Sequence, residues 1–238
     1  RKAVCVSAVA AENVDLVGRD PALSAHLLRL VNSSFFCRGS AIADLKTAVV
    51  RLGLRLVRTL TLSAEVFGKG PPKPVPGFSH TDLQAMSLRR LLLVERLVKD
   101  PVTRATAGTA ALLADIGQLA LAMGAPERLT AAIARAAEAK IPLEQAESEL
   151  YGTTHAVIGS YLLGIWGFPN LVVDAVAWHH QRPVPRAPGV LDAASAVALA
   201  TAVLESAPLP TEWAKQHGLE SQLDLARSLA ETLSGSDR

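Results

Sequence analysis

Apolar residues recur at every third or fourth position along most of this chain, and that spacing constrains the fold more than any other feature. It predicts helices at 80–98, 102–122, 126–139, 142–151, 153–166, 169–180, 189–206 and 219–234. No stretch alternates apolar and polar residues in the manner of a half-buried strand. The sequence therefore predicts an all-α fold.

The first 67 residues carry clear signals for the start and end of helices. Asp20 and Pro21 combine an N-cap with a proline at the first helical position. The polar run Asn32–Ser34 ends this helix. Asp44 can cap the next helix, and a further helical segment follows Gly53. These signals predict a small helical subdomain at the N-terminus.

The clearest interruption is "GKGPPKPVPG", residues 68–77, which holds four prolines and three glycines. Such a stretch can form neither a helix nor a central strand. We therefore expect an N-terminal helical part at 1–67, a connector at 68–78 and a larger helical part at 79–238. A packed connector within one domain is the alternative.

Composition and charge exclude several classes of function. Half of the residues are hydrophobic but only 4% are aromatic, which suits closely packed helices. The net charge of +2, with scattered basic residues, argues against nucleic-acid binding. The longest apolar stretch, Val190–Leu204, is interrupted by Asp192 and is shorter than the roughly 18 residues of a membrane span. We expect a buried helix there and no membrane association.

The cysteines and the N-terminus bear on the cellular compartment. Cys5 and Cys37 form no CxxC motif, which is typical of thiols with packing roles in a reducing compartment. The basic start at Arg1 is followed by too short an apolar stretch for a signal peptide. The sequence predicts a cytoplasmic location, and its start at Arg1 rather than Met indicates a piece of a longer protein.

Three of the six histidines lie in an informative context. We expect Thr153 to cap a helix with His155 in its first turn, where Gly159 lets a neighbouring helix approach closely. His179 and His180 fall in the last predicted turn of 169–180, where favourable interaction with the helix dipole is a sufficient alternative explanation. The other three histidines are predicted to be surface or capping residues: His26, His80 and His217.

Asp115 lies in the apolar segment "TAALLADIGQLAL", residues 109–121. A buried carboxylate needs a partner, because an isolated buried charge is very costly. A histidine from another helix is the obvious partner, and imidazole with carboxylate is also a ligand set of Zn, Mn and Fe hydrolases.

Two groups of arginines share helical faces. A solvated face is the default interpretation, and docking of an acidic partner is the alternative. The groups are Arg51, Arg55 and Arg58, and Arg89, Arg90 and Arg96.

Several segments, in order and spacing, resemble the HD superfamily of metal-dependent phosphohydrolases and especially its HDOD branch, the HD-related output domain of bacterial signalling proteins. The N-terminal segments are "DPALSAHLLRLVNSSFF" (20–36) and "IADLKTAVVRLGLRLVRTLTL" (42–62). The C-terminal segments are "ALLADIGQLAL" (111–121) and "ESELYGTTHAVIGSYLLGIWGFPNLVVDAVAWHH" (147–180). The resemblance covers nearly the whole chain and implies one HDOD module, an HD-like helical bundle with an N-terminal helical subdomain.

The chain departs from the HD pattern at its ligands. Aligned with the family, the early His falls at Met86, the His of the His–Asp pair at Ala114 and the late Asp near Thr201. These side chains cannot replace nitrogen and carboxylate ligands, and the bridging geometry that activates a metal-bound water is lost with them. The resemblance therefore implies an HD scaffold without catalysis, with no metal and no cofactor.

We expect a non-catalytic regulatory module, a pseudoenzyme of bacterial signal transduction. Its partners would be signalling proteins or fused receiver and cyclic-dinucleotide domains. The retained Asp115, His155, His179 and His180 would form a structural polar network. One alternative is a phosphohydrolase or phosphodiesterase with a reduced metal site on those four residues. Another is a sensor that binds an anionic nucleotide in the same cleft.

Overall fold

The computed structural model describes residues 21–33, 36, 41–68, 70–205 and 211–234. These residues form helices and no β-strand, with one isolated bridge between Ala187 and Val190. The prediction of an all-α fold is confirmed. The predictions for Asp20 and the two cysteines lie outside the described residues, as does the side chain of His26.

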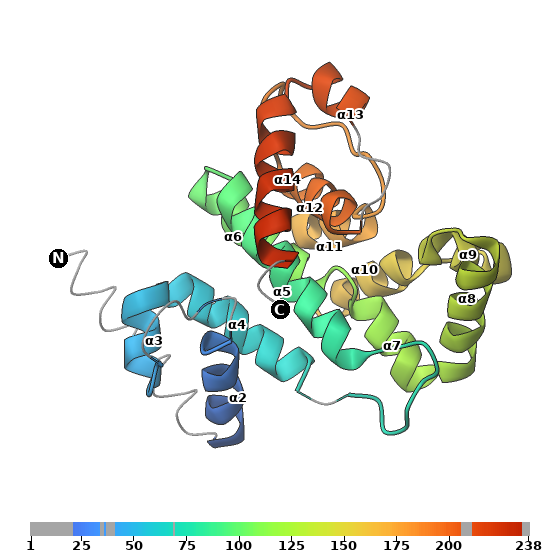
Figure 1. Ribbon diagram of the computed structural model, residues 1–238, viewed down its shortest axis with the longest axis horizontal. Coiled ribbons are helices and arrows are strands. Elements are labelled where there is room, and N and C mark those ends of the chain that lie inside the picture. The colour runs from blue at the N-terminus through green and yellow to red at the C-terminus, as the bar shows by residue number, and fades with distance from the viewer. Residues whose placement is uncertain (1–20, 34–35, 37–40, 69, 206–210, 235–238) are drawn as a thin grey trace. The chain divides into compact units, whose positions relative to one another are not determined.

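The chain divides into two compact units, and the second unit begins at Gly70. The first unit contains the helices α2 (Pro21–Val31), α3 (Leu45–Leu52) and α4 (Leu54–Val66), which contact one another (Figure 1). Asp44 caps α3 by accepting a hydrogen bond from the Thr47 backbone N–H at 2.8 Å. Gly53, with φ of +83°, makes the sharp turn into α4, a left-handed conformation that favours glycine.

Asn32 fastens the chain beyond α2. Its Nδ2 donates to the carbonyl oxygens of Leu28 at 2.9 Å and Ile42 at 2.8 Å, and its Oδ1 accepts from the Ile42 backbone N–H at 2.7 Å. One side chain thus satisfies three backbone groups and ties the end of α2 to the residues that lead into α3.

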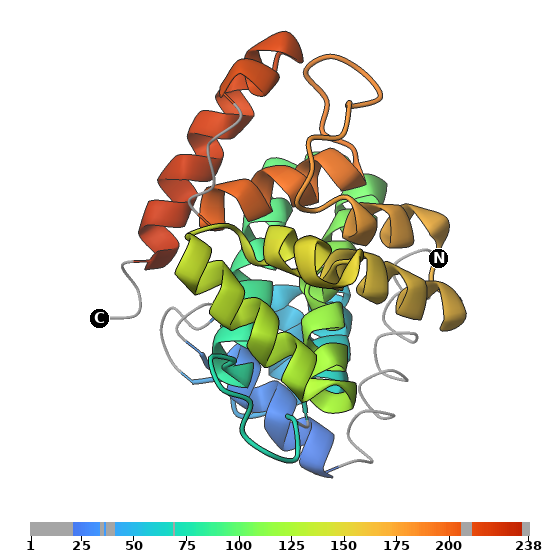
Figure 2. The same ribbon diagram turned by 90° about the vertical axis from the view of Figure 1, so that its right-hand side faces the viewer.

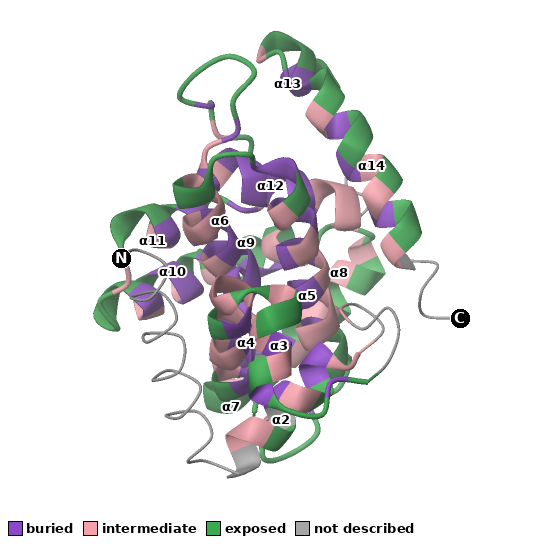
Figure 3. Cartoon of the chain, turned by 90° about the vertical axis from the view of Figure 1, so that its left-hand side faces the viewer, coloured by how far each residue is buried: buried purple, intermediate pink, exposed green. Residues whose placement is uncertain are grey.

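The second unit carries the remaining helices. They are α5 (His80–Leu97), α6 (Pro101–Leu113), α7 (Ile116–Gly124), α8 (Pro126–Ala139), α9 (Leu143–Tyr151), α10 (His155–Ile165), α11 (Asn170–Ala177), α12 (Ala193–Leu204), α13 (Thr211–Gln216) and α14 (Glu220–Ser234). The sequence did not predict α13. Helix α12 packs against α5, α6, α11 and α14, and it is buried along most of its length (Figures 2 and 3). Helix α10 packs against α7 and α11, while α8 and α9 form a neighbouring pair.

Part of the Pro-rich stretch packs into the second unit. Val75 is buried in a small core with Ala122 and Leu129, and the partly buried Phe78 and Ile133 pack against that core. This segment therefore lies against α7 and α8.

The segment predicted as one helix at 102–122 is broken at Ala114–Asp115, which separates α6 from α7. Asp115 stands at the N-cap of α7, a position that suits aspartate better than a helix interior does. Taken together, Pro101–Gly124 is long and apolar enough for a membrane span, but 67% of its most apolar window is buried inside the protein. A core helix meets the same criteria.

Two helix ends also differ from prediction. Thr154, not Thr153, caps α10 through its Oγ1, which accepts from Val157 N at 3.3 Å. The helix predicted at 169–180 ends at Ala177, so His179 and His180 lie in the following turn rather than in the last helical turn.

Candidate functional site

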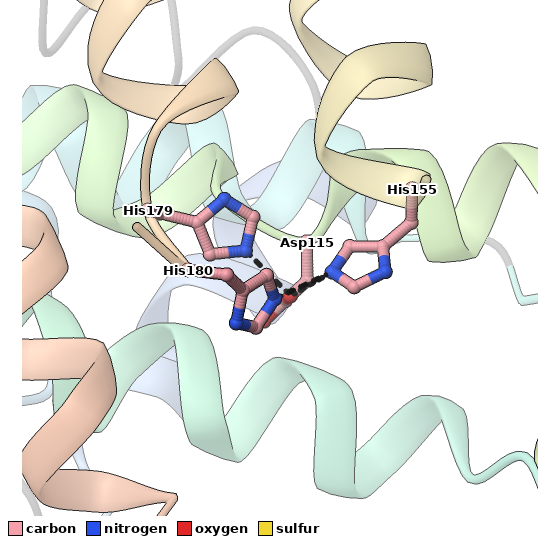
Figure 4. A group of neighbouring side chains, drawn as sticks. All are labelled: Asp115, His155, His179 and His180. Atoms are coloured by element: carbon pink, nitrogen blue, oxygen red, sulfur yellow. Dashed lines mark hydrogen bonds and ion pairs between the residues drawn. The ribbon is translucent and has the colours of Figure 1, made fainter. Parts of the chain in front are cut away.

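The structure brings together the four residues that the sequence singled out, from three separate segments of the second unit (Figure 4). Asp115 lies in the turn between α6 and α7, His155 is the first residue of α10, and His179 and His180 follow α11. One ligand atom from each residue lies within 4.8 Å of all the others. We call these four residues the histidine cluster.

Two glycines set the distance between α7 and α10. A Cβ atom on Gly117 would overlap the carbonyl oxygen of His155, and one on Gly159 would lie 3.0 Å from Ile116 Cγ2. Only hydrogen fits at Gly117, because the obstructing atoms belong to the backbone. The close approach predicted at Gly159 is confirmed, and this crossing brings His155 beside Asp115.

Asp115 uses its two carboxylate oxygens differently. Oδ2 pairs with the guanidinium of Arg90 at 2.9 Å. Oδ1 accepts a hydrogen bond from Gln118 at 3.0 Å and lies 3.4 Å from His155 Nε2 and 3.5 Å from His179 Nε2. Burial by itself would raise the pKa of Asp115, but the Arg90 charge and the hydrogen bond from His155 hold it well below its usual value. Asp115 is therefore a carboxylate.

Each histidine of the cluster is oriented by an acceptor at its Nδ1. A ring held in this way directs Nε2 toward the opposite side, as in histidines that bind metals. The three Nδ1 contacts are His155 to Glu147 Oε2 at 2.7 Å, His179 to the Val176 carbonyl at 2.6 Å, and His180 to Glu205 Oε2 at 3.4 Å. On the inner side, the Nε2 atoms of His155 and His180 lie 2.8 Å apart.

The resemblance to the HD superfamily implies a metal centre, and the donor atoms of the cluster fit one divalent ion. Three imidazoles and a carboxylate suit Zn, Fe or Mn. A tetrahedral site with ligand bonds near 2.0–2.1 Å places its donor atoms roughly 3.3 Å from one another. Three of the six donor separations, 2.8, 3.4 and 3.5 Å, lie around that value, and all six are within 4.8 Å. The expectation of no metal remains a prediction, and this geometry is the reason to test it.

His179 supplies an independent indication of a cation. Burial is the main cause that lowers its pKa, to about 4, so its ring is neutral at pH 7. Because its Nδ1 donates to the Val176 carbonyl, Nε2 carries a lone pair. That buried atom has no hydrogen-bond partner among the described residues and faces the negative Asp115 Oδ1. A cation between the two atoms would satisfy both.

His155 is different. Burial alone would lower its pKa, but hydrogen bonds to Asp115 and Glu147, together with their charges, raise it to about 10. In the metal-free protein His155 is therefore an imidazolium that neutralises part of the surrounding negative charge.

Sequence reasoning missed Arg90, Glu147 and Glu205. The prediction of a solvated face was wrong for Arg90, whose side chain is fully buried, whereas Arg96 is exposed. Helix α5 contacts α6, α12 and α14, so little of its surface faces solvent.

A helical signal could have revealed two of the missed residues. Arg90 lies four residues after Met86, and Glu205 four residues after Thr201, so each follows a presumed lost ligand position by one turn. Met86 is half-buried on α5, while Thr201 on α12 and Ala114 beside Asp115 are fully buried. His80 and His217, both half-buried, lie outside the cluster.

The cluster is closed to solvent. Asp115, His155 and His179 are at most 2% exposed, and the His180 side chain is 11% exposed. A small pocket that Arg128, Tyr151 and Thr154 help to line reaches Glu147, but none of the four cluster residues lines it.

The comparisons with known proteins identify the family of the chain. The HDOD domain model matches residues 7–182. An uncharacterized protein of Treponema pallidum is 29% identical over 173 residues, which cover 71% of this chain but only 33% of that protein. The chain therefore spans about a third of the length of this relative.

Solved structures with the same fold come from several bacteria. An HDOD domain protein of unknown function from Geobacter sulfurreducens has a TM-score of 0.75 at 20% identity, covering 96% of this chain and 83% of that one. A protein provisionally assigned as a phosphohydrolase in Shewanella amazonensis has a TM-score of 0.68 at 27% identity, covering 93% of this chain and 81% of that one. The MmoQ response regulator of Methylococcus capsulatus has a TM-score of 0.52 at 29% identity, covering 93% of this chain and 89% of that one.

Proposed function

The chain belongs to the HDOD domain family, a signalling-related branch of the HD superfamily, and on this premise we propose that it acts by binding a protein partner and turns over no substrate. The observation that carries the proposal is the closure of the histidine cluster. A catalytic metal keeps an open coordination position that substrate and water can reach. Here three of the four possible ligands, Asp115, His155 and His179, are at most 2% exposed, and the fully buried Arg90 lies against the Asp115 carboxylate.

Similarity to a response regulator supports the signalling part of the proposal. MmoQ, which is named as a response regulator, shares the fold at 29% identity over 93% of this chain. Response regulators convey signals through contacts with other proteins or domains, so binding is the activity expected of a module of this type.

An exposed apolar face on α10 supports the binding part of the proposal. Val157, Tyr161 and Ile165 are spaced four residues apart, so they lie on one side of the helix, and they are 52%, 72% and 65% exposed. Trp166 follows at 52% exposure. Contiguous exposed apolar surface of this kind marks interaction sites in soluble proteins. We call these four residues the α10 outer face.

A pair of matched variants tests the binding proposal. Tyr161→Lys/Ile165→Lys alters the α10 outer face, whereas Val102→Lys alters a 77% exposed valine on α6. We expect a protein captured from lysate of the source organism to be retained by the wild type and by Val102→Lys, and to be lost with the double variant. Equal capture by all three proteins, or no capture by any, would contradict the proposal.

The absence of turnover is tested separately. Protein purified without a polyhistidine tag and supplied with Mn²⁺, Fe²⁺ or Zn²⁺ should hydrolyse a generic phosphodiester such as bis-p-nitrophenyl phosphate no faster than the His155→Ala/His180→Ala variant does. Turnover that requires these histidines would overturn the proposal.

A metal-dependent phosphoester hydrolase is the second candidate, and the donor set of the histidine cluster favours it. Three oriented imidazoles and one carboxylate could hold an ion that polarises a phosphoryl oxygen. This function would require the closed site to open, so it predicts both histidine-dependent turnover and an increase in solvent access when a phosphoester is added.

A further inference from the structure

Arg90 is a permanent cation in direct contact with the histidine cluster. Its side chain is fully buried on α5, and an arginine remains charged at any pH the protein meets. One guanidinium nitrogen contacts Asp115 Oδ2 at 2.9 Å, and another contacts Glu205 Oε1 at 3.3 Å.

Both carboxylates also face the histidines with their other oxygen. Asp115 Oδ1 faces His155 and His179, and Glu205 Oε2 lies 3.4 Å from His180 Nδ1. Each carboxylate is thus shared between the guanidinium and the histidines. In two-metal sites, carboxylates are shared in the same way between ions about 3.5–4 Å apart.

The charges at this centre favour one divalent ion rather than two. Asp115, Glu147 and Glu205 contact the cluster or its guanidinium and bring three negative charges, of which Arg90 compensates one. With neutral histidines, two negative charges remain, and one divalent cation balances them. Glu144, 3.9 Å from His180 and 27% exposed, lies at the edge where water screens it.

We propose that the Arg90 guanidinium takes the place of a second metal ion, so that the histidine cluster binds a single divalent ion of the Zn, Fe and Mn group. The ligands would be Asp115 Oδ1 and Nε2 of His155, His179 and His180. This assignment predicts a stoichiometry that depends on the residue at position 90. It does not depend on partner binding, which the α10 variants measure.

Manganese titration of the full chain tests the proposal. Metal-stripped, tag-free protein is titrated with Mn²⁺, bound ions are counted by elemental analysis after desalting, and the electron paramagnetic resonance spectrum is recorded. The His155→Ala/His180→Ala variant reports any ions held elsewhere. We expect one Mn²⁺ per wild-type chain, with the spectrum of an isolated ion.

Variants at position 90 distinguish one ion from two. Arg90→Lys keeps the charge and should still bind one Mn²⁺. Arg90→Met frees two carboxylate oxygens, and Arg90→Glu adds a third carboxylate, so both should bind two ions with the spectrum of a magnetically coupled pair. If either variant folds only with metal, the ions are counted at the end of Mn²⁺-driven refolding. Arg135→Met, which removes an exposed ion pair with Glu149, should bind one ion like the wild type.

The number of bound ions decides whether the proposal holds. No ion or two ions in the wild type would overturn the proposal, and so would a single ion in both Arg90→Met and Arg90→Glu. None of these results would change capture of a partner by the α10 outer face, so failure of this inference and failure of the proposed function can be told apart.

Discussion

The two sides of α10 differ from those of an ordinary amphipathic helix. The inner side buries His155, Gly159 and Ser160 beside Leu163, while the outer side exposes Val157, Tyr161 and Ile165. A helix at a protein surface ordinarily buries its apolar side. The polar and small residues inside serve the histidine cluster and the close crossing with α7. The apolar residues outside have no such role in the fold, and they form the surface that we propose for partner binding.

The largest loss of stability should come from removing the carboxylate that the inner side of α10 contacts, that of Asp115. Asp115→Ala leaves Arg90 and His155 without their shared partner in a buried site, and breaking such a pair costs about 3–5 kcal/mol. Urea unfolding of the metal-free protein measures this loss. Glu149→Ala is the matched control, because its ion pair with Arg135 has nearly the same length, 3.0 Å, but is exposed. That control should cost at most about 1 kcal/mol, and equal costs for both variants would contradict the importance of the buried pair.

The next largest loss of stability is expected from a substitution where α7 crosses α10. Gly117→Ala places a methyl group against the His155 carbonyl, and neither backbone can move without disturbing the histidine cluster. We expect a loss of about 3 kcal/mol in the free energy of unfolding. Gly164→Ala is the control on the opposite side of α10, where a Cβ meets no atom within 4 Å. It should stabilise the helix by about 0.5–1 kcal/mol, so a similar loss at both glycines would contradict the comparison.

The sequence was sufficient to identify the inner side of α10. His155 and Gly159 are four residues apart, so they lie on the same side of a helix. The carboxylate of Asp115 within an apolar segment required a buried partner. The break at Ala114–Asp115 was not predictable from local pattern, because alanine and leucine on both sides favour a continuous helix. Tertiary contacts of the carboxylate accompany that break, and they involve residues far apart in sequence.

Arg90 and the outer side of α10 were missed for a related reason. Helix periodicity shows which residues share a face but not how many faces are covered, and α5 is covered by three helices. In α10 the apolar residues lie all around the helix, so the pattern could not tell which of them remain exposed. Only the position of α7 and α11 against α10 decides this.

The pH dependence of stability tests the electrostatics of the inner side. The pKa of His155 is raised to about 10 in the folded, metal-free protein, against an ordinary value near 6.5. The folded state therefore holds a proton that the unfolded state releases above pH 6.5. This stabilisation is complete below pH 6.5 and is lost as the pH rises toward 10.

Between pH 7 and 9 we expect the free energy of unfolding to fall by roughly 2 kcal/mol, since one proton contributes at most about 1.4 kcal/mol per pH unit. Urea unfolding with a chelator present measures the slope. His155→Gln should remove most of it, and an unchanged slope in that variant would assign the titration to another group.

The smallest effect on stability belongs to the outer side. Tyr161→Lys/Ile165→Lys replaces residues that are 72% and 65% exposed, so the free energy of unfolding should change by no more than about 0.5 kcal/mol. Leu163→Ala, between them in sequence but fully buried, should cost about 2–5 kcal/mol. If the double variant were as unstable as Leu163→Ala, the outer side would be part of the folded core. If it is as stable as the wild type and no longer captures a partner, selection for binding rather than for folding explains why α10 exposes its apolar residues.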